Sequence, residues 1–255
     1  MNEASSSEVR RFGSNAEVVS ENTATRSRWV PETKFGQWFI GTRIWERYVV
    51  EESMRTFVRL LGGRGRKRGR GLDAGCGPGV SLPLLERYFA PAMIIGLDID
   101  PGEIERARAH VRRCACPVEF VRGDVAQLVF ADSSFDLILC HQTLHHVVDQ
   151  AAVLREFRRV LAPGGVLLIA ESCREFILST PVRVLFRHPN EVQKTAGEYQ
   201  RLLRDAGFSF TSADVETSRP FWSLADWGLR ERLGWRAQRE AEPTQVTVVA
   251  FKPAV

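Results

Sequence analysis

The chain has 255 residues, of which 44% are hydrophobic and 26% charged, and its formal net charge is +4. These fractions exclude wholesale disorder and fibrous repeats, and the length suffices for one large domain, or a domain with a small cap, that has its own core. The cysteine count of five is odd and the N-terminus has no apolar signal segment, which indicates the cytoplasm rather than secretion. No run approaches the ~20 apolar residues that cross a bilayer, so we expect no membrane span.

The positive charge is concentrated in one basic loop, residues 64–70, which holds five arginines and lysines and no acid. The rest of the chain is close to neutral. No aromatic residues are interleaved with these cations, and the loop leads into the amino end of an expected strand. We therefore expect a solvated loop and no nucleic-acid partner.

Residues 1–27 are polar and predict a mobile tail. Residues 28–62 carry aromatic and aliphatic side chains at helical spacing and predict a helical cap that ends at Gly62. From residue 63 strands and helices alternate, which predicts a mostly parallel sheet with covering helices. The expected strands are 70–74, 93–98, 117–121, 135–140 and 166–170, and the expected helices are 82–89, 101–113 and 150–161.

The second half is less regular. Residues 172–193 mix apolar and basic side chains and predict a lid. Thr195 and Glu198 form a capping-box pattern that opens a helix through Ala206. Two further strands are expected at 208–216 and 244–252, with an aromatic insert, residues 219–236, between them.

A glycine-rich turn, Leu72-Asp73-Ala74-Gly75-Cys76-Gly77-Pro78-Gly79, joins the strand at 70–74 to the next helix. Glycines there let the backbone approach a ligand closely, beside free N–H groups of the helix N-terminus. A dinucleotide site requires a third glycine where this chain has Val80. The preceding Asp73 suits a cationic amino group better than a pyrophosphate.

Two more acids follow the next strands. Asp98 lies 19 residues after Gly79, a typical distance for a carboxylate that accepts hydrogen bonds from ribose hydroxyls, although NAD enzymes use the same device. Asp124 follows the third strand and is able to accept a hydrogen bond from an adenine amine or to serve as a turn residue.

Five segments in this order, LDAGCGPG, GLDID, GDV, FDLILCHQTLHHV and LAPGGVLLIAE, are similar to the motifs of class I S-adenosylmethionine-dependent methyltransferases, closely over residues 68–172 and loosely to 255. The resemblance implies a Rossmann-like, doubly wound α/β sheet of seven strands with the last one antiparallel. It implies S-adenosyl-L-methionine as cofactor. The matching positions imply cofactor contacts by Asp73, Ala74, Gly75, Cys76, Gly77, Gly79, Asp98, Ile99, Asp124, Val125, Cys140 and His141.

Three residues near the carboxyl ends of the strands are candidates for catalysis. His141 is the first candidate for a base or an orienting contact, or else it only shapes the cofactor pocket. His145 has a chemical role, or packs under the next helix. Glu171 ends its strand and is expected to point at the crevice, where it orients an amine or hydroxyl, or else it caps the following segment.

All six tryptophans lie in residues 29–45 or 222–235. We expect these two segments to fold over the crevice and form an aromatic pocket for a hydrophobic or planar acceptor, although they would need large apolar residues merely to attach to the domain. In the lid, Arg187 or His188 would contact an acidic acceptor or form a solvated basic edge.

The favoured function is methylation of a small molecule. The alternatives are a methyltransferase that acts on RNA or protein, and a catalytically silent binding subunit. Cys114 and Cys116 have no histidine cluster beside them in the sequence and fall short of the usual metal signature, so we expect no metal site. The oligomeric state and the acceptor atom are left open.

Overall fold

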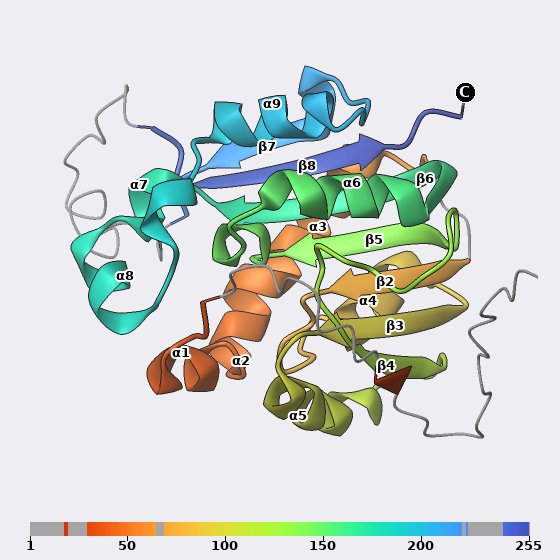
Figure 1. Cartoon of the computed structure of the whole chain (residues 1–255), viewed down its shortest axis with the longest axis horizontal. Helices are drawn as coiled ribbons and strands as arrows, with labels where there is room; N and C mark the ends of the chain where they lie inside the picture. The colour runs from red at the N-terminus through yellow and green to blue at the C-terminus, as the bar shows by residue number, and fades with distance from the viewer. Residues whose placement is uncertain (1–17, 20–29, 65–68, 221–222, 224–241, 255) are drawn as a thin grey trace, which may run out of the picture.

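The computed structural model describes residues 18–19, 30–64, 69–220, 223 and 242–254. One sheet runs through these residues in the order β1-β4-β3-β2-β5-β6-β8-β7 (Figure 1). The strands are β1 Val18–Val19, β2 Arg70–Ala74, β3 Met93–Asp98, β4 Val118–Arg122, β5 Phe135–His141, β6 Leu161–Ser172, β7 Val215–Ser218 and β8 Gln245–Phe251.

The expected doubly wound sheet is confirmed. Strands β2 to β6 pair in parallel, and β8 runs antiparallel to both of its neighbours, β6 and β7. The two-residue β1 adds an eighth strand beside β4, within the segment expected to be a mobile tail. The rest of that tail lies outside the described residues.

Helices cover both faces of the sheet (Figure 1). Buried side chains of α3 Glu51–Leu61, α4 Leu82–Phe89 and α5 Pro101–Val111 form one core with one face of the strands. Those of α6 Gln150–Val160 and α9 Ala196–Asp205 form a second core on the opposite face. Helix α9 begins with the expected capping box, in which Thr195 and Glu198 each bond the other's backbone. Among the described helices, none is long and apolar enough to span a bilayer.

Short helices gather beyond the carboxyl ends of the parallel strands (Figure 1). Those of the cap are α1 Lys34–Phe39, α2 Arg43–Trp45 and the π-helix η1 Glu46–Val50, which leads into α3. Those of the lid are α7 Arg174–Ile177, α8 Thr180–Leu185 and the 3-10 helix η3 Asn190–Val192. Both segments are therefore placed where an open parallel sheet binds its ligands.

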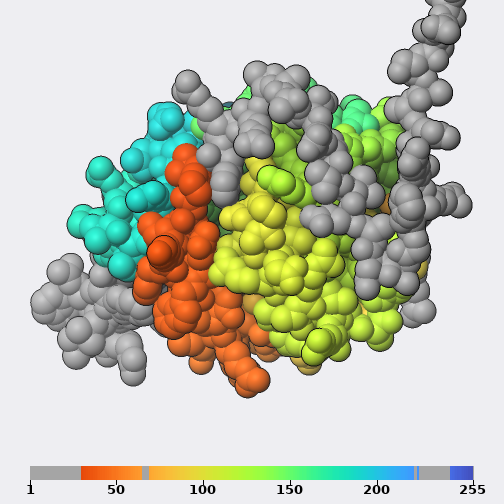
Figure 2. All heavy atoms as spheres, turned by 60° about the horizontal axis from the view of Figure 1, so that its bottom comes forward, coloured from red at the N-terminus to blue at the C-terminus, as the bar shows by residue number. Residues whose placement is uncertain are grey.

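Cap and lid touch across this end of the sheet, and Figure 2 shows them side by side in orange and cyan. Thr33 Oγ1 donates to the Leu185 carbonyl at 2.6 Å, and the Arg187 N–H donates to Glu32 Oε1 at 2.9 Å. The ring of Phe186 packs edge-on against Phe35, with centroids 5.8 Å apart.

The expectation of a strand over 208–216 is largely wrong. Ser209 only bridges Phe251, and Ser212–Asp214 form a 3-10 turn, η4. The cause is Asp214, whose Oδ2 accepts hydrogen bonds from both the N–H and the hydroxyl of Thr211 at 2.8 Å and so closes the turn. The strand β7 starts only after it.

The basic loop is in part structural. Arg64 forms an ion pair with the buried carboxylate of Asp214 and lies over the ring of Phe251, and Arg70 lies over the ring of Phe135. These three contacts attach both ends of the loop to the body of the domain. Residues 65–68 lie outside the described part of the chain.

Candidate active site

A cavity of about 420 Å³ lies at the carboxyl ends of β2, β3 and β5. Its floor is the glycine loop and the acids that follow these strands, and its walls come from the cap and the lid. Backbone and side chains from both halves of the chain therefore meet at one site.

The glycine loop has the backbone that only glycine adopts easily. Gly75, Gly77 and Gly79 have φ values of 78°, 50° and 78°. A Cβ on Gly79 would lie 2.7 Å from that of Ala107, so this glycine allows α5 to pack against the loop. A Cβ on Gly77 would meet only Ile40, at 3.9 Å, so this stretch of backbone is open to a ligand.

Two carboxylates line the cavity beside this loop, the buried Asp73 and the half-buried Asp98. Asp73 accepts a hydrogen bond from Ser81 Oγ at 2.5 Å. Asp98 accepts from the N–H groups of Gly77 at 2.8 Å and Asp100 at 2.9 Å. Burial raises the pKa of Asp73 to about 7 and that of Asp98 to about 6, because it penalises the charged form more than these hydrogen bonds favour it.

The other expected cofactor residues divide into two groups. Ile99, Asp124 and Val125 line the cavity, as do Gly75, Cys76 and Gly77. Asp124 also accepts a hydrogen bond from Ala126 N at 2.9 Å, so the turn role is realised as well. Ala74, Gly79 and Cys140 do not line the cavity.

Cys140 is a correction to the expected cofactor contacts. Its side chain is fully buried in the core that packs against α6 and α9, where Sγ lies 3.7 Å from Glu171 Oε1. Side chains alternate along a strand, so Cys140 and the next residue, His141, project to opposite faces of β5. Only His141 reaches the cavity.

His141 is poorly suited to accept a proton. Its Nε2 lies 3.2 Å from the hydroxyl oxygen of Ser53, which in turn donates to the Val49 carbonyl at 2.8 Å, so this ring nitrogen already has a hydrogen-bond partner inside the protein. Burial lowers the pKa of His141 to about 4. A base this weak has little tendency to take up a proton at neutral pH, so the arrangement favours a role for His141 in shaping the cofactor pocket.

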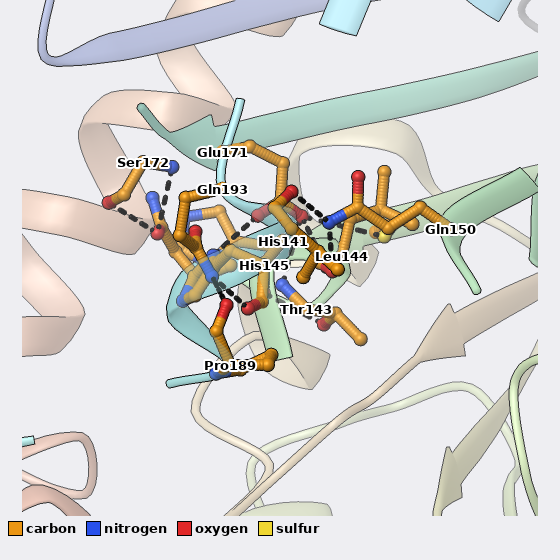
Figure 3. A network of polar contacts seen from close by, with 12 residues as sticks. His141, Thr143, Leu144, His145, Gln150, Glu171, Ser172, Pro189 and Gln193 are labelled. Atoms are coloured by element: carbon orange, nitrogen blue, oxygen red, sulfur yellow. Dashed lines mark hydrogen bonds and ion pairs between the residues drawn. The ribbon is translucent and has the colours of Figure 1, made fainter. Parts of the chain in front are cut away.

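Glu171 does not point into the crevice, contrary to expectation (Figure 3). Its carboxylate is fully buried and accepts four contacts. Oε1 accepts from the backbone N–H groups of Thr143 and Leu144, both at 2.9 Å, and from Cys140 Sγ, while Oε2 lies 2.6 Å from His145 Nδ1. The residue thus caps the 3-10 turn η2, Leu144–His146, and orients His145.

His145 lines the cavity, and its hydrogen bond to Glu171 fixes the orientation of its ring. With Nδ1 as hydrogen donor to Glu171, Nε2 retains its lone pair. A carboxylate that orients a histidine in this way is the arrangement that enzymes use to direct a base. Of the three expected catalytic residues, His145 and Glu171 are brought into one unit, and His141 stands apart from it.

Gln142 follows the strand β5, a position from which the sequence predicts a place near the transferred methyl group, and it lines the cavity. Its φ of 55° is unusual for a residue with a side chain. Its Oε1 accepts hydrogen bonds from the N–H of Ser172 at 3.2 Å and from its hydroxyl at 2.7 Å. The buried Nε2 has no hydrogen-bond partner within the described part of the chain, and Gln142 lines the cavity. It is a free donor for a ligand.

Part of the cavity wall is aromatic. Side chains from the cap and lid line it: Phe35, Phe39, Trp45, Tyr48, Phe176 and Phe186. Phe39 is central to this group, with ring centroids 5.6 Å from Trp45 and 6.1 Å from Phe186. Trp38 is 63% exposed and does not line the cavity. Trp29 and the three tryptophans of the insert lie outside the described residues, and of that insert Ser223 lines the cavity.

The carboxylates that line the cavity give it a negative charge. Of the residues that the structure describes, those lining the cavity include Glu32, Asp73, Asp98, Asp100, Glu103 and Asp124 but no lysine or arginine. Arg187 does not line the cavity, and its backbone N–H donates to Glu32. Such a site suits a cationic ligand at the acids and a neutral ligand at the aromatic wall.

A family described as a methyltransferase domain matches residues 72–169. The chain is 32% identical over 220 residues to 27-O-demethylrifamycin SV methyltransferase from Amycolatopsis mediterranei and covers 78% of it. It belongs to the class I S-adenosylmethionine-dependent methyltransferases. It is also 30% identical to phosphoethanolamine N-methyltransferase 3 from Arabidopsis thaliana, of which it spans 37%.

Solved structures agree with this methyltransferase fold. The [4+2]-cyclase SpnF superposes with a TM-score of 0.59 at 23% identity, over 79% of this chain and 81% of that one. A Haemonchus contortus phosphoethanolamine N-methyltransferase 2, in complex with S-adenosylhomocysteine, gives 0.58 at 18% identity, over 78% of this chain and 52% of that one. At these identities the likeness shows the fold alone.

The residues of the cavity fit the cofactor of this family. S-adenosylmethionine is a cation with a ribose diol, and the described part of the cavity offers buried carboxylates, a backbone open at Gly77 and no competing cation. When bound, it supplies an electrophilic methyl group to an acceptor. The expected cofactor is thus confirmed at the level of the family.

Proposed function

We propose that this methyltransferase transfers a methyl group to a small neutral acceptor with an aromatic or otherwise apolar body. The aromatic wall formed by cap and lid carries the proposal. A phosphate-bearing acceptor, such as phosphoethanolamine or RNA, needs a cation to bind its phosphate, and no lysine or arginine lines the described cavity. The relative from Amycolatopsis mediterranei, whose name gives 27-O-demethylrifamycin SV as its acceptor, supports an acceptor that is not a macromolecule.

The proposed cofactor contacts follow the geometry. Asp98 would bind the ribose hydroxyls with the lone pairs that its two backbone N–H bonds leave free. Asp73 and the backbone at Gly75 and Gly77 would hold the methionine end. Asp124, Ile99 and Val125 would lie beside the adenine.

We propose that the nucleophilic atom of the acceptor lies beside His145. The Glu171–His145 pair presents a lone pair at Nε2 to a hydroxyl or amine, and the unpartnered amide of Gln142 offers a donor to the acceptor's remaining polar atom. The apolar walls exclude water from the reacting atoms, which favours alignment for an in-line displacement.

The acceptor class is tested by transfer of a radiolabelled methyl group to a panel of compounds. We expect transfer to hydroxylated aromatic compounds to exceed that to phosphoethanolamine or RNA. In the Phe39→Ala variant the KM for the best acceptor should rise about tenfold, because a buried aromatic contact is worth ~1–2 kcal/mol, while the Kd for S-adenosylmethionine stays constant.

Trp38→Ala is the matched control, because Trp38 lies on the same helix but faces solvent. Its KM should equal that of the unchanged chain. Preferred transfer to phosphoethanolamine or RNA would contradict the proposed acceptor, as would equal effects of the two substitutions.

The affinity for S-adenosylmethionine should depend on pH. A cationic ligand binds ionised carboxylates, and the pKa values of Asp73 and Asp98 are raised to about 7 and 6. Protons therefore compete with the cofactor as the pH falls, and we expect about 100-fold weaker binding at pH 5.5 than at pH 8 by calorimetry, if both carboxylates bind it in their ionised form. Without ligand the sign is opposite: the raised pKa values stabilise the fold in acid, and this contribution is lost as the pH rises through 6 to 7.

The Asp73→Asn variant cannot ionise at this position and should give a flatter pH profile of binding. An unchanged profile in this variant would show that Asp73 is not linked to cofactor binding.

A further inference from the structure

Three histidines meet at the wall of the cavity. His145 and His146 lie on the turn η2, and His188 comes from the lid. One ring nitrogen or the other of each histidine lies within 4.8 Å of those of the other two. The ring centroids are 4.4 Å, 5.0 Å and 4.7 Å apart, so the three rings surround one point.

This donor set suits a transition metal ion. Imidazole nitrogen is a common ligand of zinc, and three histidines with an open fourth position make the usual catalytic zinc site. Nitrogens about 2.0–2.1 Å from a tetrahedral zinc ion lie about 3.4 Å apart. From separations within 4.8 Å, the nitrogens would need to approach one another by at most about 1.4 Å, which side-chain rotation supplies.

A buried carboxylate supports one of the ligands. Glu171 Oε2 accepts a hydrogen bond from His145 Nδ1 at 2.6 Å, which leaves Nε2 as the ligating atom (Figure 3). Metal-binding histidines almost always donate their second N–H to a carboxylate, a carbonyl or water, and this contact raises the basicity of the ligand.

Two buried glutamines clamp the segments that carry the histidines. Gln193 Nε2 donates to the carbonyls of His145 and Pro189, both at 2.8 Å. Gln150 Nε2 donates to the carbonyls of Leu144 at 3.0 Å and Val192 at 3.3 Å. The turn with His145 and His146 is thereby tied to the lid beside His188, and this preorganisation reduces the cost of binding an ion.

We propose that His145, His146 and His188 bind a divalent transition metal ion such as Zn²⁺, with its open position toward the acceptor. With the ion bound, His145 Nε2 is a metal ligand, and the ion takes over its contact with the acceptor. An acceptor hydroxyl that binds the ion would have a lowered pKa and would lose its proton to solvent as it enters the cavity, so that its oxygen becomes the nucleophile. This role of the ion rests on the proposed function, whereas metal binding itself does not. The proposal departs from the expectation of no metal, which considered only Cys114 and Cys116.

The test is titration of the full, chelator-treated chain with Zn²⁺ by calorimetry, and with Co²⁺, whose visible absorption reports tetrahedral nitrogen coordination. We expect one equivalent to bind. His188→Ala should weaken Zn²⁺ binding at least 30-fold, and Glu171→Gln 10- to 100-fold. Saturating Zn²⁺ should raise the Tm of the unchanged chain but not that of His188→Ala, whose own melting transition shows that it is folded.

His110→Ala is the matched control, because His110 lies on α5 and does not line the cavity. It should bind Zn²⁺ as the unchanged chain does. Equal Zn²⁺ affinity in the unchanged chain and His188→Ala, or loss of binding in His110→Ala alone, overturns the proposal. The Kd for S-adenosylmethionine is measured on the same samples: cofactor binding without a Zn²⁺ site defeats this inference and leaves the proposed function standing, and the reverse result defeats only the proposed function.

Discussion

Replacing Asp98 with alanine is expected to weaken the binding of S-adenosylmethionine at least 100-fold. Hydrogen bonds to a charged group contribute about 1.5–3 kcal/mol each, and a ribose diol makes two of them, so the loss is about 3 kcal/mol or more. The substitution also leaves the N–H groups of Gly77 and Asp100 without their acceptor, which loosens the loop that meets the cofactor. Isothermal calorimetry at pH 8, where Asp98 is ionised, measures the effect.

Asp205→Ala serves as the control, because Asp205 is exposed on α9 and does not line the cavity. Its affinity should be that of the unchanged chain. A loss below about threefold in Asp98→Ala would argue against a ribose contact at this position.

Replacing Glu171 with alanine is expected to lower the free energy of unfolding by about 3–5 kcal/mol. The carboxylate is the acceptor for two backbone N–H groups, the Cys140 thiol and His145, and all of these would be left unpaired in a site closed to water. Glu171→Gln should lose less stability, because its amide oxygen still accepts hydrogen bonds, although its amide nitrogen then faces other donors. Urea unfolding followed by circular dichroism measures both.

Glu175→Ala is the matched control, since Glu175 lies on the exposed side of α7 close in sequence. Its unfolding free energy should change by no more than about 0.5 kcal/mol. If Glu171→Ala is as stable as this control, the buried carboxylate is not the cap of the turn η2.

Short-range patterns in the sequence were sufficient to predict the elements around the glycine loop. The strand β2, the three glycines and Asp98 are close in sequence to the elements that position them, so spacing and turn chemistry predicted their arrangement. The helix α9 was predicted for the same reason, because both partners of its capping box lie within four residues. The turn at Asp214 was missed because the side chain of one residue redirects a stretch that alternates like a strand.

The part of the cavity proposed for the acceptor depends on contacts between segments that are far apart in the chain. A single sequence does not reveal these contacts. Glu32 bonds Arg187, which lies 155 residues further along the chain, and the pattern around neither residue signals the other. Similarly, LHHV and Arg187-His188-Pro189 were each recognised, but nothing local indicated that their histidines share a wall. Glu171 was expected at the crevice because it ends a strand, yet the adjacent turn uses all its acceptor capacity.

The aromatic wall of the cavity has a further consequence for how this enzyme acquires new substrates. In the described part of the chain, all six aromatic side chains that form this wall belong to the cap and the lid, outside the stretch 72–169 that matches the methyltransferase family. None of the six is among the buried residues of either core, so substituting them leaves the buried core residues and the glycine loop unchanged. Substrate range can therefore diverge rapidly among relatives while the cofactor chemistry stays fixed, and exchanging cap and lid together, as one interlocked pair, is the natural unit for redirecting this enzyme by design.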